Sequence, residues 1–100
     1  MDGKQLERAQ RITLNLPVVR ENIRTGRTKT NLGSVYIGYG KARDGVWHGV
    51  YFTDAMGGTG QTVEFEEDND ETAVESSLFA MGYQSMQVWE QNKLRSGVNG

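Results

Sequence analysis

The chain has 100 residues, 36% of them hydrophobic and 24% charged, which is the size and composition of one globular domain. It contains no cysteine, which excludes disulfides and thiolate metal sites. No apolar run approaches the ~18 residues that a membrane-spanning helix needs, and the polar N-terminus lacks the pattern of a secretory signal. We therefore expect a cytoplasmic protein.

The net charge of −2 conceals an uneven distribution along the chain. Residues 1–43 carry nine basic and three acidic side chains, a balance of +6, whereas residues 44–100 carry two basic and ten acidic ones, a balance of −8. Such asymmetry indicates either separate basic and acidic binding segments or two halves that complement each other within one fold. We favour the second reading, because small domains interleave charge for solubility.

The first segment has the three- and four-residue spacing of an amphipathic helix that Asp2 can cap. Its apolar positions are Leu6, Ala9, Ile12 and Leu16. Proline fits the first turn of a helix, so Pro17 indicates a second short helix over residues 17–24. The alternation in residues 12–18 also fits a strand, but we favour helix. Residues 24–33 are polar and basic, which is typical of a loop.

From residue 34 the apolar period changes to two, which indicates strands. In residues 34–41 one face carries Val35, Ile37 and Tyr39, and the other carries Tyr36, Gly38 and Gly40. Asp44-Gly45 is a tight-turn signal. In residues 46–53 one face carries Val46, His48, Val50 and Phe52, and the other carries Trp47, Gly49, Tyr51 and Thr53.

A glycine-rich connection over residues 55–61 then leads to a third strand with Val63 and Phe65 inward. A long helix over residues 70–94 follows. Thr72 and Glu75 have capping-box spacing, and Gly97 supplies a stop. The apolar face of this helix is wider than one sheet requires.

These patterns predict one α+β domain. It has an N-terminal helix or two short helices, a three-stranded antiparallel β-meander, and a long C-terminal helix packed on the sheet. Residues 1–33 form the helical and basic segment, residues 34–67 the sheet and residues 70–94 the final helix. The expected core is Val35, Ile37, Val50, Phe52, Val63, Phe65, Val74, Leu78, Met81 and Val88.

No catalytic, cofactor or metal site is expected, so we interpret the chain as non-enzymatic. His48 is the one histidine, and a metal site needs several ligands. An enzyme would have to use His48 with Asp54 or with the acidic run of residues 64–71. That run lacks the central glycine of a calcium loop.

The aromatic side chains carry the leading functional hypothesis, a module that contacts another protein or a second copy of itself. Tyr36, Trp47 and Tyr51 are expected on one face of the sheet, unless the N-terminal helices cover them. The candidate partner-binding residues are Tyr36, Trp47, Tyr51, Phe79 and Met86. The alternative is nucleic-acid binding by these aromatics and a basic arm. The arm consists of Arg20, Arg24, Arg27 and Lys29.

Two resemblances concern topology alone. The order helix, three strands, helix resembles double-stranded RNA-binding domains, but acids replace the lysines that those domains carry at the start of the last helix. Residues 44–81 resemble the core of HicB-type antitoxins. The matching positions are Asp44, Gly45, Phe52, Asp54, Glu71, Ala73 and Glu75. Thr53 replaces the family's proline, and the link before the helix is longer, so neither resemblance implies a function.

Overall fold

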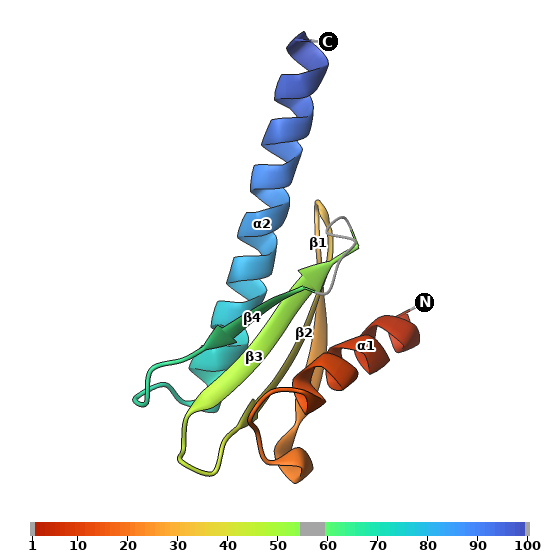
Figure 1. Ribbon diagram of the computed structural model, residues 1–100. Helices are drawn as coiled ribbons and strands as arrows, with labels where there is room; N and C mark the ends of the chain where they lie inside the picture. Colours follow the sequence, from red (N-terminus) through yellow and green to blue (C-terminus); the bar gives the residue numbers. More distant parts are fainter. Residues whose placement is uncertain (1, 55–59, 100) are drawn as a thin grey trace.

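The structure, a computed structural model, describes residues 2–54 and 60–99 (Figure 1). Most of the glycine-rich connection expected at residues 55–61 lies outside the described residues. The elements are α1 (Asp2–Leu14), a 3-10 turn η1 (Arg20–Asn22), β1 (Arg24–Thr30), β2 (Gly33–Lys41), β3 (Trp47–Thr53), β4 (Gln61–Glu64) and α2 (Glu71–Asn99).

The four strands form an antiparallel meander in the order β1-β2-β3-β4, with α1 on one face and α2 on the other (Figure 1). The predicted architecture of N-terminal helix, antiparallel meander and long C-terminal helix is confirmed. A fourth strand adds to it, because residues 24–30 pair with β2. The loop predicted at residues 24–33 is therefore wrong, and the sheet has one strand more than predicted.

Strand β1 has few apolar residues because it lies at the edge of the sheet. Threonines favour extended backbone, and charged side chains protect an exposed edge from unwanted pairing. Gly26 faces α2, where the Phe79 ring packs over it. The turn to β2 is closed by Thr30, whose hydroxyl donates to the Gly33 carbonyl and accepts from the Leu32 amide.

The second short helix predicted over residues 17–24 is wrong. Helix α1 ends at Leu14, and only the three-residue turn η1 follows. The chain instead passes the end of β2, where the Val19 amide donates to the Lys41 carbonyl at 2.8 Å. Val18 packs above Gly40. The strand alternative for residues 12–18 is also wrong, because α1 covers its first part.

The side chains that β2 and β3 place on the same side of the sheet differ from the prediction. Tyr36 lies opposite Phe52, and Ile37 lies opposite Tyr51. A tight Asp44-Gly45 turn would have paired Ile37 with Phe52. The strands instead end with the pair Lys41 and Trp47, so the connection between them has five residues, an odd number in place of the predicted two. A one-residue change of register exchanges every side chain between the two faces.

The core consequently has two parts, one on each side of the sheet. The cluster under α2 contains Val35, Ile37, Tyr39, Phe65, Val74, Leu78 and Met86. The smaller cluster under α1 contains Ala9, Tyr36 and Phe52, with Leu6 and Ile12 beside it. The Arg8 guanidinium lies 4.2 Å from the centroid of the Phe52 ring and covers it.

The N-cap of helix α2 lies two residues before the expected capping box. The Asp70 carboxylate accepts from the Ala73 amide at 2.8 Å, so Asp70 and not Thr72 is the N-cap. Glu75 is used elsewhere, because its carboxylate accepts a 2.7 Å hydrogen bond from the Tyr39 hydroxyl. Burial raises the pKa of Tyr39, and the Glu75 and Glu71 carboxylates raise it further. The helix also continues through Gly97, the expected stop.

A candidate protein-contact surface on the distal half of α2

The predicted aromatic platform is divided between the two sides of the sheet. Trp47 and Tyr51 pack against the cluster under α2, whereas Tyr36 stacks on Phe52 under α1, with ring centroids 5.5 Å apart. The expectation that these three rings share a face is therefore wrong. The N-terminal helix does not cover Trp47 either, because α2 does.

Glycines in β2 and β3 let both helices pack closely on the sheet, so no open surface is left between these rings. A Cβ on Gly49 would lie 2.6 Å from a methyl group of Leu78. On the other face, a Cβ on Gly38 would lie 2.8 Å from the Ala9 carbonyl oxygen. Gly38 and Gly49 are thus positions at which the helices pack closely on the sheet.

Two of the five predicted partner-binding side chains are buried in the fold. Tyr36 is 3% exposed and Met86 is 4% exposed, so neither offers a surface to a partner, which corrects both assignments. Trp47, Tyr51 and Phe79 are half-buried and pack on the α2 cluster. Sequence periodicity could not show which of these five side chains are buried, because buried and half-buried side chains recur at the same spacing.

The described apolar side chains with the greatest exposure lie farther along α2. Val88 is 51% exposed, Trp89 is 44% exposed and Leu94 is 67% exposed. The predicted core position of Val88 is therefore wrong. Its spacing from Leu78 matches the buried stripe, but the sheet has ended by that point. We call residues 87–99 the distal half of α2.

The distal half projects because the helix is longer than the strands on which it packs. Its 29 residues span about 43 Å, whereas the nine residues of β2 span about 30 Å. The first half of α2 lies across the sheet and the second half extends past it (Figure 1). The whole molecule measures 50 × 29 × 20 Å, and its long dimension reflects this projection.

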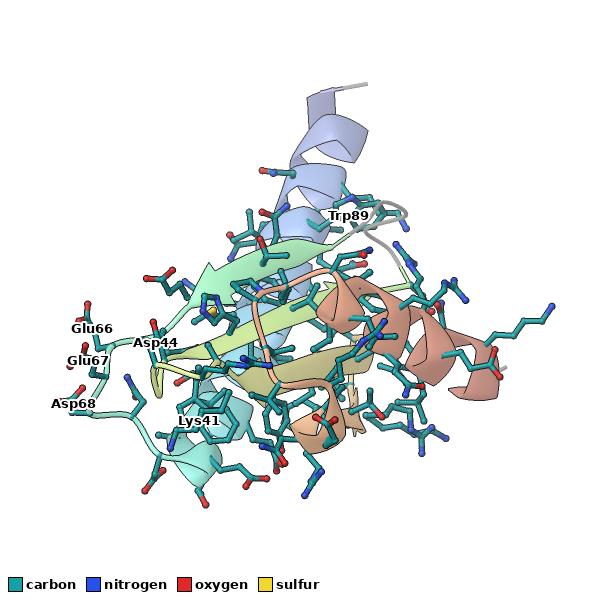
Figure 2. All side chains as sticks on the ribbon, turned by 60° about the horizontal axis from the view of Figure 1, so that its bottom comes forward. Lys41, Asp44, Glu66, Glu67, Asp68 and Trp89 are labelled. Atoms are coloured by element: carbon teal, nitrogen blue, oxygen red, sulfur yellow. The ribbon has the colours of Figure 1, made fainter. Side chains whose placement is uncertain are left out.

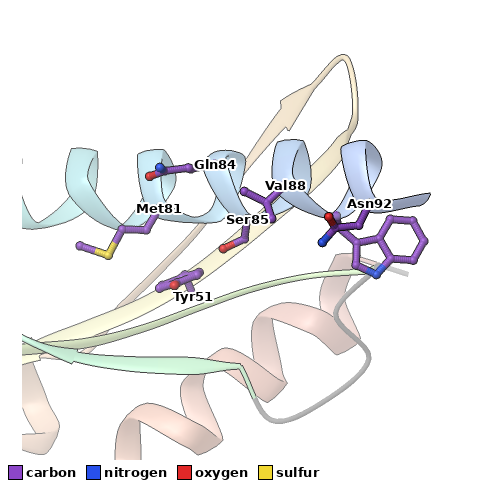
Figure 3. Close-up of a pocket in the computed structure, with 7 residues that line it drawn as sticks. Tyr51, Met81, Gln84, Ser85, Val88 and Asn92 are labelled. Atoms are coloured by element: carbon purple, nitrogen blue, oxygen red, sulfur yellow. The ribbon is translucent and has the colours of Figure 1, made fainter. Parts of the chain in front are cut away.

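A cavity of about 430 Å³ opens where α2 leaves the sheet, between the helix and β3 (Figure 3). Tyr51 forms its floor, and one side of α2 forms its wall. The lining residues on the helix are Met81, Gln84, Ser85, Val88, Trp89 and Asn92. It is therefore an apolar groove with a polar rim, open at the surface and continuous with the distal half.

The acidic run lies at the other end of α2. Figure 2 shows Glu66, Glu67 and Asp68 on the loop that leads into the helix, well away from Trp89. Among residues 2–54 and 60–99, no three acidic or histidine side chains are grouped closely enough to hold a metal ion.

The four residues of the basic arm do not share one surface. Arg24 is paired with Tyr39 and lies on the α2 face. Arg27 pairs with Tyr36, so it lies on the α1 face together with Lys29, two positions along the strand. Arg20 belongs to η1. Only part of the predicted arm could therefore contact the same ligand.

His48 and Asp54 are not brought together. They are six residues apart on one extended segment, which separates them by about 20 Å. The Asp54 carboxylate accepts instead from the Gln5 side-chain amide at 2.9 Å. His48 pairs across strands with Glu64 beside a cavity of about 360 Å³, which Leu16 and Pro17 also line. The non-enzymatic assignment stays a prediction.

Of the helices in the part of the chain that the structure describes, none combines the length and apolar character needed to cross a bilayer. Comparisons with protein-family models, with curated proteins and with solved structures find no match to this chain.

Proposed function

We propose that this chain is a small interaction module that binds protein through the distal half of α2. The observation that carries the proposal is the exposure of Val88, Trp89 and Leu94 on a helix that extends beyond its own sheet. Aromatic residues, tryptophan above all, are enriched among the side chains that dominate binding energy at interfaces.

Helix energetics support the same proposal. A helical segment of about a dozen residues is marginal in water unless its apolar side is packed. The first half of α2 has that packing, with Val74 and Leu78 fully buried. The distal half has its apolar side chains without a matching surface in the described chain. A protein partner would supply the surface and fix the helix at the same time.

The adjoining cavity suits an anchor residue of such a partner. Its apolar floor at Tyr51 and its polar rim at Gln84 and Asn92 reproduce the apolar centre and polar border of protein interfaces. In this proposal the chain acts in the cytoplasm as a regulator, inhibitor or assembly factor. Nucleic-acid binding by the basic arm has less support, because Arg24 faces away from Arg27 and Lys29.

Site-specific photo-crosslinking in extracts of the producing cells tests the proposal. A photoreactive residue at Asn92, on the rim of the cavity, is expected to give a discrete crosslinked product. The same residue at Gln10, exposed on α1, is expected to give none, and Trp89→Ala is expected to abolish the Asn92 product. Equal products from both positions, or none from Asn92, would contradict it.

A further inference from the structure

The side of α2 that packs on the sheet continues into the distal half. With about 100° between successive residues, Trp89, Glu90, Lys93 and Leu94 fall within about 140° of the helix circumference. Gly82 and Met86, both buried against the sheet, lie on the same side earlier in the helix. We call the four outer residues the distal stripe.

The distal stripe has an apolar side chain at each end and two opposite charges between them. Read toward the C-terminus, it presents an apolar residue, an acid, a base and an apolar residue. Read in the opposite direction, the apolar ends coincide and the acid meets the base. Lys93 lies close to the stripe's aromatic end, with its Nζ 5.3 Å from the centroid of the Trp89 ring.

This order is complementary to itself only when two copies run antiparallel. Around a two-fold axis level with Gln91 and Asn92, Glu90 of one copy faces Lys93 of the other at the centre of the pair, and this contact occurs twice, as a closed two-fold interface requires. Trp89 lies beside Trp89 of the other copy on one flank, and Leu94 lies beside Leu94 on the other flank. A parallel pair would instead place Glu90 on Glu90 and Lys93 on Lys93, which is repulsive.

We infer that a second copy of this chain occupies the distal stripe, through antiparallel pairing of the two α2 helices. This inference rests on the proposed function and names its partner. The charges of the stripe select self-pairing, and its apolar ends supply the attraction. In the pair, the second copy covers Trp89 and Leu94, which the sheet is too short to reach.

The paired segment is short, and this limits the affinity. Interfaces that bury less than about 1,200 Å² are typical of weak complexes. An interface made by about one and a half helical turns of each copy belongs to that class. We therefore expect a dissociation constant on the order of micromolar, so the association must be followed over a range of concentrations.

Charge exchange at the stripe, measured by sedimentation velocity, tests the inference. The unmodified chain is expected to pass from monomer to dimer as concentration rises. Glu90→Lys and Lys93→Glu are each expected to raise the dissociation constant at least tenfold, because each creates two like-charge contacts. An equimolar mixture of the two variants restores opposite charges at all four positions and is expected to dimerise again.

Two controls make the result specific. Glu67→Lys makes the same charge change in the exposed loop before α2 and is expected to leave dimerisation unchanged. Helix content by circular dichroism is expected to stay equal among all variants, which excludes unfolding as the cause of dissociation.

Each alternative outcome overturns the inference in a recognisable way. A chain that stays monomeric at all concentrations has no such dimer, whereas the crosslinking at Asn92 still decides the proposed function. Single variants that dimerise like the unmodified chain place the interface elsewhere. A mixture that stays monomeric rules out the antiparallel pairing.

Discussion

Gly38 of β2 lies directly under Ala9 of α1, so close that an added Cβ would sit 2.8 Å from the Ala9 carbonyl oxygen. The Thr13 hydroxyl, which donates to that carbonyl, occupies the same space. A glycine in the centre of a strand weakens the strand by itself. Its presence here indicates that the close contact with α1 compensates for this cost.

Gly38→Ala is expected to destabilise the fold by about 1–3 kcal/mol, because α1 must move away from the sheet. The matched control is Gly3→Ala, whose new Cβ would meet nothing within 4 Å and which is expected to be neutral or stabilising by up to about 1 kcal/mol. Urea unfolding followed by circular dichroism measures both. Equal effects of the two variants would show that α1 does not pack on Gly38.

Thr53→Val is expected to stabilise the protein by about 1 kcal/mol. Within the described residues, Thr53 Oγ1 is a buried oxygen without a hydrogen-bond partner, and valine has nearly the same shape without that oxygen. Thr13→Val is the matched control. It removes a buried hydroxyl that donates to Ala9 at 2.7 Å, so it is expected to destabilise by a similar amount. Thermal unfolding of both variants should show shifts of opposite sign, and a loss of stability in both would refute the assignment for Thr53.

Tyr39 is expected to make the stability fall at alkaline pH. Its pKa is raised in the folded state by burial and by the Glu75 and Glu71 carboxylates. Below about pH 10 the phenol is neutral in both states. As the pH rises above 10, the unfolded chain loses this proton while the folded chain retains it, so the free energy of unfolding decreases.

Tyr39→Phe removes the titrating group, so its stability is expected to depend less on pH between 9 and 11. At neutral pH it should be about 1 kcal/mol less stable than the unmodified chain, because the hydrogen bond to Glu75 is lost. Glu75→Gln keeps an acceptor without the charge and should give an intermediate slope. Denaturant titrations at each pH measure these slopes, and parallel curves for all three proteins would be the contrary result.

The two tryptophans are expected to differ in solvent access. Trp47 packs on the α2 cluster and its ring lies 6.0 Å from that of Tyr39, whereas Trp89 is 44% exposed. Trp89→Phe leaves Trp47 as the only tryptophan, and Trp47→Phe leaves Trp89, so excitation at the red edge of tryptophan absorption reports each one alone. At concentrations where the chain is monomeric, acrylamide should quench Trp89 more strongly and its emission should lie at longer wavelength. Indistinguishable quenching of the two would contradict the placement of α2 over Trp47.

Local patterns in the sequence are sufficient to predict most of the elements. The alternation in residues 34–53 correctly assigns side chains to opposite faces within each strand. It cannot decide how two strands combine, because that depends on the length of the connection between them. A five-residue connection around Asp44 and Gly45, in place of a two-residue turn, is enough to bring Tyr36 beside Phe52 and to separate it from Trp47.

Strand β1 could not be found from apolar periodicity, because an edge strand covered on one face needs few apolar residues. Its remaining signal is the threonines at positions 25, 28 and 30, which favour extended backbone. The exposure of Trp89 could not be predicted from the sequence either. Spacing shows that a side chain belongs to a stripe, but only the length of the sheet shows where that stripe ceases to be covered.

The division of the core into two clusters implies that the fold opens in parts. Helix α1 is held by the smaller cluster of Ala9, Tyr36 and Phe52, while α2 is held by the larger one. Separate clusters of unequal size favour subglobal opening, in which the weaker unit detaches before global unfolding. Amide protons of α1 should therefore exchange with solvent faster than those of β2 and β3. The sheet together with the first half of α2 is expected to exchange most slowly, as the base from which the distal half of α2 projects.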